Sequence, residues 1–161
     1  PASFAVEVWQ QIMLTGTPQG LLPIGLGARD TLRLEKGYAL YGHELSQEIS
    51  PLEAGLGWIT KLDKDDFVGK AALAAQKAGG APRRRVGLVM QERGIPREGY
   101  PIFVGDREVG VVTSGTMSPT LKVGVALALV TPDVAQADTR LEVAIRNRRM
   151  GAKVTRPPFV K

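Results

Sequence analysis

The residues best suited to chemistry in this sequence lie around Arg29, directly after a glycine-rich turn. Gly25 and Gly27 permit close approach of the backbone to a ligand or to a neighbouring element. The guanidinium of Arg29 presents a planar fork of donors that matches a carboxylate. By spacing alone, two interpretations compete: Arg29 binds an anionic ligand, or it forms an internal ion pair with Glu35 or Glu44.

Other polar residues offer less chemistry. His43 is the only histidine, so no multi-histidine metal site is possible, and its place in a polar stretch predicts a surface loop. The hydroxyl-rich segment 113–118 is either a loop that lines a binding channel or a barrel turn held by side chain–backbone bonds. Ser114 has no second histidine or cysteine to activate it as a nucleophile. The acidic run at 63–66 lacks the glycine and glutamate spacing of a calcium loop. We therefore predict no catalytic residue and no metal ligand.

An amphipathic helix over residues 3–14 is the first element that the pattern predicts. Phe4, Val8 and Ile12 recur at helical spacing, and Ser3 is a suitable N-cap. The other predicted elements of this half are a turn at 18–20, a short strand at 21–24, a helix over 30–36, a strand at 57–62 and an alanine-rich helix over 67–77. These elements are too few to close a sheet of their own, so we expect a part of a larger α+β domain.

The pattern changes after a candidate linker at 78–82. Short apolar or alternating runs, separated by glycine and proline, predict strands at 84–91, 101–104, 108–114, 123–129, 141–145 and 152–155. A hairpin turn is expected at Gly105-Asp106. We therefore expect an α+β chain in which the tail of an α+β domain (1–80) precedes a small antiparallel C-terminal β-barrel (81–161).

The composition favours a globular, cytoplasmic protein. The chain has 161 residues, of which 43% are hydrophobic and 23% charged, with no cysteine and no apolar run near the ~20 residues that span a membrane. The net charge of +5 is concentrated in arginines at 83–85 and 146–149. Such clusters suit nucleic acid, an acidic protein or an anionic cofactor, but without interleaved aromatic residues solvated strand ends are the simpler interpretation.

Several stretches resemble the T-protein family of the glycine cleavage system, which are tetrahydrofolate-dependent aminomethyltransferases. The pattern Gly-Leu-Gly-Ala-Arg-Asp-x-Leu-Arg-Leu-Glu-x-Gly-x-x-Leu-Tyr-Gly covers residues 25–42, and Ser50-Pro-Leu-Glu-Ala-Gly-Leu-Gly-Trp58 resembles the next block of the family. Further similar stretches lie at 66–73, 83–88, 110–122, 143–146 and 158–160. Their common order argues against a chance match.

The resemblance implies transfer of a one-carbon unit from the aminomethyl-lipoyl arm of H protein to tetrahydrofolate, with release of ammonia and without a metal. Tetrahydrofolate would be the co-substrate and lipoylated H protein the partner. Arg29 would bind the folate glutamyl carboxylate, and Trp58 would either pack on the p-aminobenzoyl ring or belong to the core. Tyr41 is expected in the core, while Arg33 and Glu35 are expected to fix their helix against the sheet.

Full T proteins are more than twice as long, and the acidic residues credited with positioning the folate lie upstream of the matched stretches. The resemblance therefore implies a C-terminal fragment that is inactive alone. Apolar surface around 21–26 and Trp58 is expected to make it dimerise.

Two alternatives stay open. The folate-binding part of a sarcosine or dimethylglycine dehydrogenase, or of a related demethylase, shares the Arg29 block, and a flavin-binding fingerprint upstream would favour it. The second alternative is a non-enzymatic module whose basic barrel binds nucleic acid or an acidic protein. A steeply salt-dependent affinity for single-stranded nucleic acid would favour it. From the resemblance we expect neither nucleic acid nor membrane as a partner.

Overall fold

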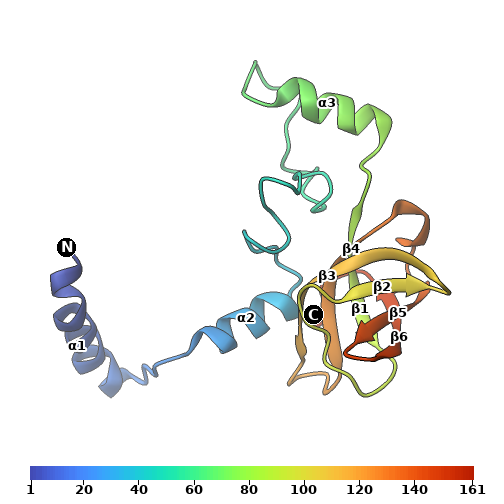
Figure 1. Cartoon of the computed structure of the whole chain (residues 1–161). Helices are drawn as coiled ribbons and strands as arrows, with labels where there is room; N and C mark the ends of the chain where they lie inside the picture. Colours follow the sequence, from blue (N-terminus) through green and yellow to red (C-terminus); the bar gives the residue numbers. More distant parts are fainter. The chain divides into compact units, whose positions relative to one another are not determined.

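The computed structural model describes residues 1–161, which form two compact units, Pro1–Asp30 and Thr31–Lys161. The helices are α1 (Ala5–Gly16), α2 (Leu26–Glu35) and α3 (Lys70–Gly79). The strands are β1 (Arg84–Met90), β2 (Pro101–Val104), β3 (Arg107–Met117), β4 (Gly124–Val130), β5 (Arg140–Ile145) and β6 (Arg148–Thr155) (Figure 1). None of the helices has the length and apolar character that crossing a membrane requires.

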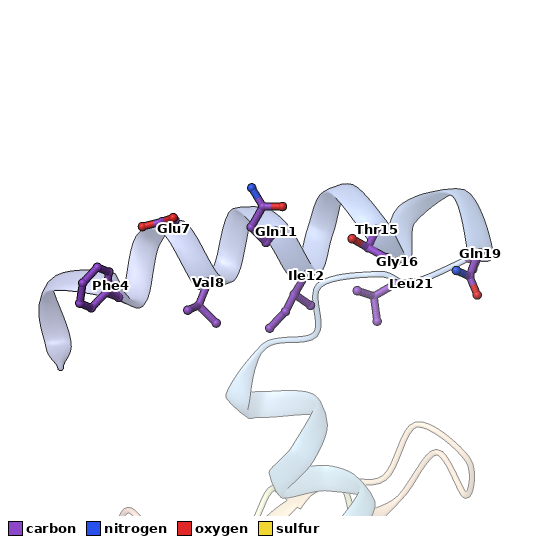
Figure 2. A pocket seen from close by; sticks show the side chains of 10 residues that line it. Phe4, Glu7, Val8, Gln11, Ile12, Thr15, Gly16, Gln19 and Leu21 are labelled. Carbon is purple, nitrogen blue, oxygen red and sulfur yellow. The ribbon is translucent and has the colours of Figure 1, made fainter.

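The first unit consists of α1 and the segment that follows it. The helix begins after Phe4 and not at Ser3, because residues Ala2–Phe4 form a separate 3-10 turn and no side chain caps the helix. Phe4, Val8 and Ile12 lie along one side of α1, as predicted, and line a groove together with Leu21 (Figure 2). The predicted strand at 21–24 is wrong: this segment has no regular structure, because no neighbouring strand pairs with it.

The six strands of the second unit close an antiparallel barrel in the order β1-β4-β3-β2-β5-β6. The predicted fold class, helical elements followed by a small antiparallel barrel, is confirmed. Each predicted strand of this half corresponds to an observed one, and β2 and β3 turn at Gly105-Asp106 as expected. The local signals sufficed here because each strand is bounded by glycine, proline or a tight turn.

Strand β4 is buried along its whole length, which explains its uninterrupted apolar sequence. Ala126, Ala128 and Val130 belong to the core inside the barrel. Val125 and Leu127 belong to a second cluster, outside the barrel, with Leu34 of α2 and the half-buried Phe159. Because both faces of β4 are covered, its sequence does not alternate between apolar and polar residues.

The end of α2 has the geometry of a Schellman motif. The N–H of Gly37 donates to the carbonyl of Leu34 and the N–H of Tyr38 to that of Arg33, while Gly37 has a φ of 70°. The backbone N–H groups of Phe159 and Val160 donate to the carbonyl of Glu35. The C-terminal segment therefore holds the last turn of α2.

The segment between α2 and the barrel differs most from expectation. The predicted strand at 57–62 is wrong, because Ile59 and Thr60 donate to carbonyls three residues back and form turns. The alanine-rich helix α3 is observed, with its start at Lys70. The domain boundary at residue 80 stays a prediction.

We predict that the chain associates with itself in solution through the apolar side of α1. Every residue on that helix is at least partly exposed, and a continuous apolar strip in water favours burial against a second surface. Light scattering should give a mass above that of the monomer at high concentration, and the double variant Val8→Asp and Ile12→Asp should return it to monomer. Glu7→Gln, on the same helix, is the control. A monomer at every concentration would refute this prediction.

Candidate functional site

The last turn of α2 meets the barrel through a buried carboxylate. Glu35 accepts hydrogen bonds from the hydroxyls of Ser118 and Thr120 and from the N–H of Thr120. The hydroxyl oxygen of Ser118 in turn accepts the N–H of Leu121. Two segments more than eighty residues apart in the sequence are thus joined by charge-assisted bonds.

A second buried carboxylate lies directly beyond α2. The side chain of Glu44 is fully buried, and its Oε2 accepts Nη1 of Arg33 at 2.8 Å and the N–H of Leu40 at 3.0 Å. Its Oε1 lies 2.7 Å from Oγ1 of Thr113 and 2.6 Å from Oγ of Ser114. Nη2 of Arg33 donates to the same Ser114 hydroxyl at 2.9 Å. Both carboxylate oxygens are therefore satisfied, as a buried charge requires.

A β-bulge explains how two successive hydroxyls reach one carboxylate. In a regular strand neighbouring side chains point to opposite faces. The pairing of β3 with β4 shifts between Val112 and Ser114, so that Thr113 is an extra residue. The strand predicted at 108–114 includes both residues, and their side chains contact Glu44 instead of forming a barrel turn. The channel-lining interpretation of segment 113–118 stays a prediction.

The arginines at 83–85 are not simply a solvated strand end, as the sequence suggested. Nε of Arg83 donates to the buried carboxylate of Glu53 at 2.6 Å. Nη1 of Arg85 donates to the carbonyl of Gly37 at 2.8 Å, and of the three only Arg84 is exposed. Ser50 and Glu53 exchange side chain–backbone bonds in the manner of a capping box, which fixes the carboxylate that receives Arg83.

The two predicted folate residues belong to different units of the chain. Arg29 lies exposed in the part of α2 that belongs to the first unit, and Trp58 lies in the second with 73% of its surface exposed. The core alternative for Trp58 is therefore wrong, and so is the expected core position of Tyr41, which is 71% exposed. Glu35 and Glu44, the carboxylates suggested as partners of Arg29, are bound by Ser118 and Thr120 and by Arg33. The structural role expected for Arg33 and Glu35 is confirmed by their contacts with the barrel.

The other charged side chains of note lie at one end of the barrel. Four arginines, Arg93, Arg97, Arg146 and Arg148, line a cleft of about 620 Å³, which we call the arginine cleft. Tyr100 lies in its wall, and none of the four arginines forms an ion pair. His43, which is half-buried in its loop, has Nδ1 3.2 Å from a carboxylate oxygen of Glu98.

Both halves of the chain match models of one protein family. The GCVT N-terminal domain matches residues 1–64, and the glycine cleavage T-protein C-terminal barrel domain matches residues 83–161. The chain belongs to the glycine cleavage T-protein family. This confirms the resemblance inferred from the motifs, and the residues that join α2 to β3 lie in both matched parts.

The similar proteins are aminomethyltransferases. That of Bacillus pumilus is 51% identical over 98% of this chain and 43% of its own length. That of Desulforamulus reducens is 52% identical over the whole chain and 44% of its own length. The crystal structure of glycine cleavage system aminomethyltransferase T from Bartonella henselae superposes with a TM-score of 0.88 at 30% identity, over 99% of this chain and 45% of that one. The chain thus spans less than half the length of these relatives.

Acid should weaken the fold through Glu35 and Glu53. Three effects act on the pKa of Glu35. The hydrogen bond from Ser118 lowers the pKa most, burial raises it, and the hydrogen bonds from Thr120 lower it further. Burial raises the pKa of Glu53, but the hydrogen bond and charge of Arg83 and the bonds from Ser50 outweigh it. Both pKa values therefore lie below the ordinary 4.5. Their stabilisation is complete above that pH and is lost as the pH falls through the lowered values.

We predict that Ser118→Ala lowers the free energy of unfolding by about 1.5–3 kcal/mol at pH 7, the range for a hydrogen bond to a charged group. It should also reduce the loss of stability below pH 4.5, because the pKa of Glu35 moves back toward its ordinary value. Urea unfolding at pH 7, 4.5 and 3.5 measures both effects. Ser46→Ala, which removes a hydroxyl from an exposed turn, is the control. Parallel pH profiles for Ser118→Ala and the unchanged chain would contradict the role of Glu35.

Proposed function

We propose that this chain is part of a tetrahydrofolate-dependent aminomethyltransferase of the glycine cleavage system. In the proposed reaction the carbon of the aminomethyl group leaves its sulfur and nitrogen and joins tetrahydrofolate, so that ammonia and the dihydrolipoyl arm are released. The observation that carries the proposal is the junction of α2 with β3, since Arg33 and Glu35 of the motif at 25–42, and Glu44 just beyond it, bind hydroxyls of the motif at 110–122. The names of the similar proteins support the same activity.

We propose Arg29 as the residue that binds the glutamyl carboxylate of folate. Its guanidinium has no hydrogen bond or ion pair within the chain, and the carboxylates that might have neutralised it are bound elsewhere. A bidentate pair with a ligand carboxylate satisfies such a group and fixes the direction of the ligand. Trp58 is proposed as an aromatic contact for the p-aminobenzoyl ring, because its exposed indole offers a face for stacking.

The protein's part in this chemistry is to orient the reactants. The three buried glutamates, Glu35, Glu44 and Glu53, all accept hydrogen bonds from protein donors, so their oxygens are committed to the fold. The pKa values of Glu35 and Glu53 are lowered, which makes these carboxylates poor proton acceptors near neutral pH. We therefore expect no ammonia release by these 161 residues alone with aminomethylated H protein and tetrahydrofolate.

The arginine cleft is proposed as the surface for lipoylated H protein, whose family surface is acidic. Its four arginines form no ion pairs of their own, so their charge is available to a partner. Arg93 and Arg97 belong to the loop after β1, Arg146 lies in the turn between β5 and β6, and Arg148 begins β6. Charge on such a rim accelerates encounter with an acidic protein and selects its orientation.

We predict that the chain binds 5-formyl-tetrahydrofolate and that Arg29→Ala weakens this binding roughly ten- to hundredfold, the equivalent of about 1.5–3 kcal/mol for a lost charge-assisted bond. Isothermal titration calorimetry measures the dissociation constant. Arg156→Ala, which removes an exposed arginine near the C-terminus, is the matched control. Equal affinities of the Arg29 variant and the unchanged chain would remove Arg29 from the proposed site.

We predict that Arg146→Gln and Arg148→Gln each weaken the binding of H protein about two- to fivefold, as expected for exposed charges worth roughly 0.5–1 kcal/mol. The double variant should also bind with a weaker dependence on salt concentration. Surface plasmon resonance at 50 and 300 mM salt tests this, with Arg140→Gln on β5 as the control. Competition by single-stranded DNA for the same arginines would instead favour the nucleic-acid alternative.

A further inference from the structure

A second basic cleft lies where the segment after α2 meets the start of β1. It has a volume of about 340 Å³ and is lined by Leu52, Glu53, Gly55, Gln76, Lys77, Gly80, Ala81, Arg84 and Arg85. We call it the Arg85 cleft. All of its residues belong to the second unit of the chain, and none of them lines the arginine cleft.

The positive charges of this cleft are only partly compensated within the chain. Lys77, Arg84 and Arg85 form no ion pair, and the carboxylate of Glu53 is neutralised by Arg83. Arg85 is half-buried, and its one protein acceptor is the carbonyl of Gly37, a neutral group. Burial lowers the pKa of this guanidinium, and the charge of Glu44 only partly opposes that effect. The electrostatic attraction between a bound anion and such a half-buried cation is stronger than its attraction to a fully hydrated cation.

The floor of the cleft leaves room beside the guanidinium. Gly55 has a φ of 74°, and a Cβ at that position would lie 3.7 Å from Nε and Nη2 of Arg85. Nε and Nη2 of Arg85 therefore face a backbone position that carries no side chain. Their N–H groups make no hydrogen bond within the chain. Gly80, also at positive φ, contributes a second wall without a side chain.

We propose that the Arg85 cleft binds a small organic anion through a carboxylate or phosphate group. Arg85 supplies the half-buried contact, and Arg84 and Lys77 add exposed charge. With a volume of about 340 Å³, the cleft has room for an organic molecule that carries the anionic group. The guanidinium fork suits both carboxylate and phosphate. This proposal does not rest on the aminomethyltransferase reaction or on Arg29.

Backbone NMR of the chain tests the proposal locally, because the amides of Gly55 and Gly80 report on this cleft and that of Gly94 on the arginine cleft. Inorganic phosphate and citrate are the two probes, each titrated against sodium chloride at equal ionic strength. We expect saturable shifts of Gly55 and Gly80 with at least one probe, and the stronger probe identifies the anionic group. The double variant Lys77→Gln and Arg84→Gln should weaken that binding about tenfold, since two favourable charges are lost.

Arg85 itself is left unchanged in this test, because its bond to Gly37 supports the fold. Arg148→Gln is the matched control, and it should leave the titration unchanged. The proposal is overturned if neither probe shifts Gly55 and Gly80 beyond the effect of chloride. It is also overturned if the double variant binds as tightly as the unchanged chain, or if Arg148→Gln reduces binding equally.

Discussion

The second unit depends on the compensation of two buried carboxylates, those of Glu35 and Glu44, where α2 meets the barrel. An uncompensated charge at these positions would cost several kcal/mol, and removal of one partner from a buried pair typically costs about 3–5 kcal/mol. Glu44 accepts hydrogen bonds from Arg33, Ser114 and Thr113, and Glu35 accepts hydrogen bonds from Ser118 and Thr120. Because the hydroxyl donors of this set come from β3 and the turn after it, the end of α2 can be satisfied in one register only.

The remaining contacts of α2 follow from that register. Once Arg33 and Glu35 are bound, Leu34 between them is directed onto Val125 and Leu127 on the outer face of β4. Phe159 completes this cluster, and its ring lies so close to Gly87 that a Cβ there would stand 2.9 Å from it. A side chain at position 87 would therefore force the Phe159 ring to shift where the C-terminal segment crosses β1. The polar bonds give the contact its specificity, while the apolar cluster contributes most of the burial.

The sequence predicted the barrel well because its strands are defined locally, by alternation and by the turns between them. It failed at 21–24 and 57–62, where similar alternation had no partner strand, and pairing cannot be seen in a single segment. The hydroxyls of Thr113 and Ser114 were noticed, yet their acceptor was not, because Glu44 lies about seventy residues away and the bulge that aligns both hydroxyls leaves no clear signature. Arg33 and Glu35 were recognised from their motif, whereas the exposure of Tyr41 and Trp58 depends on tertiary packing that no spacing reveals.

The distribution of charge explains what kind of ligand this chain can meet. The chain has 16 acidic and 21 basic residues, and the fully buried charged residues are all acidic. Three carboxylates are buried and accept hydrogen bonds from protein donors, so their charge is compensated within the fold: those of Glu35, Glu44 and Glu53. The arginines of the arginine cleft, and Arg29 on α2, keep their charge for solvent or for a ligand. Two of these carboxylates, Glu44 and Glu53, bind Arg33 and Arg83, so internal compensation uses both signs of charge. The excess of basic residues stays on the surface and favours anionic partners at the exposed arginines.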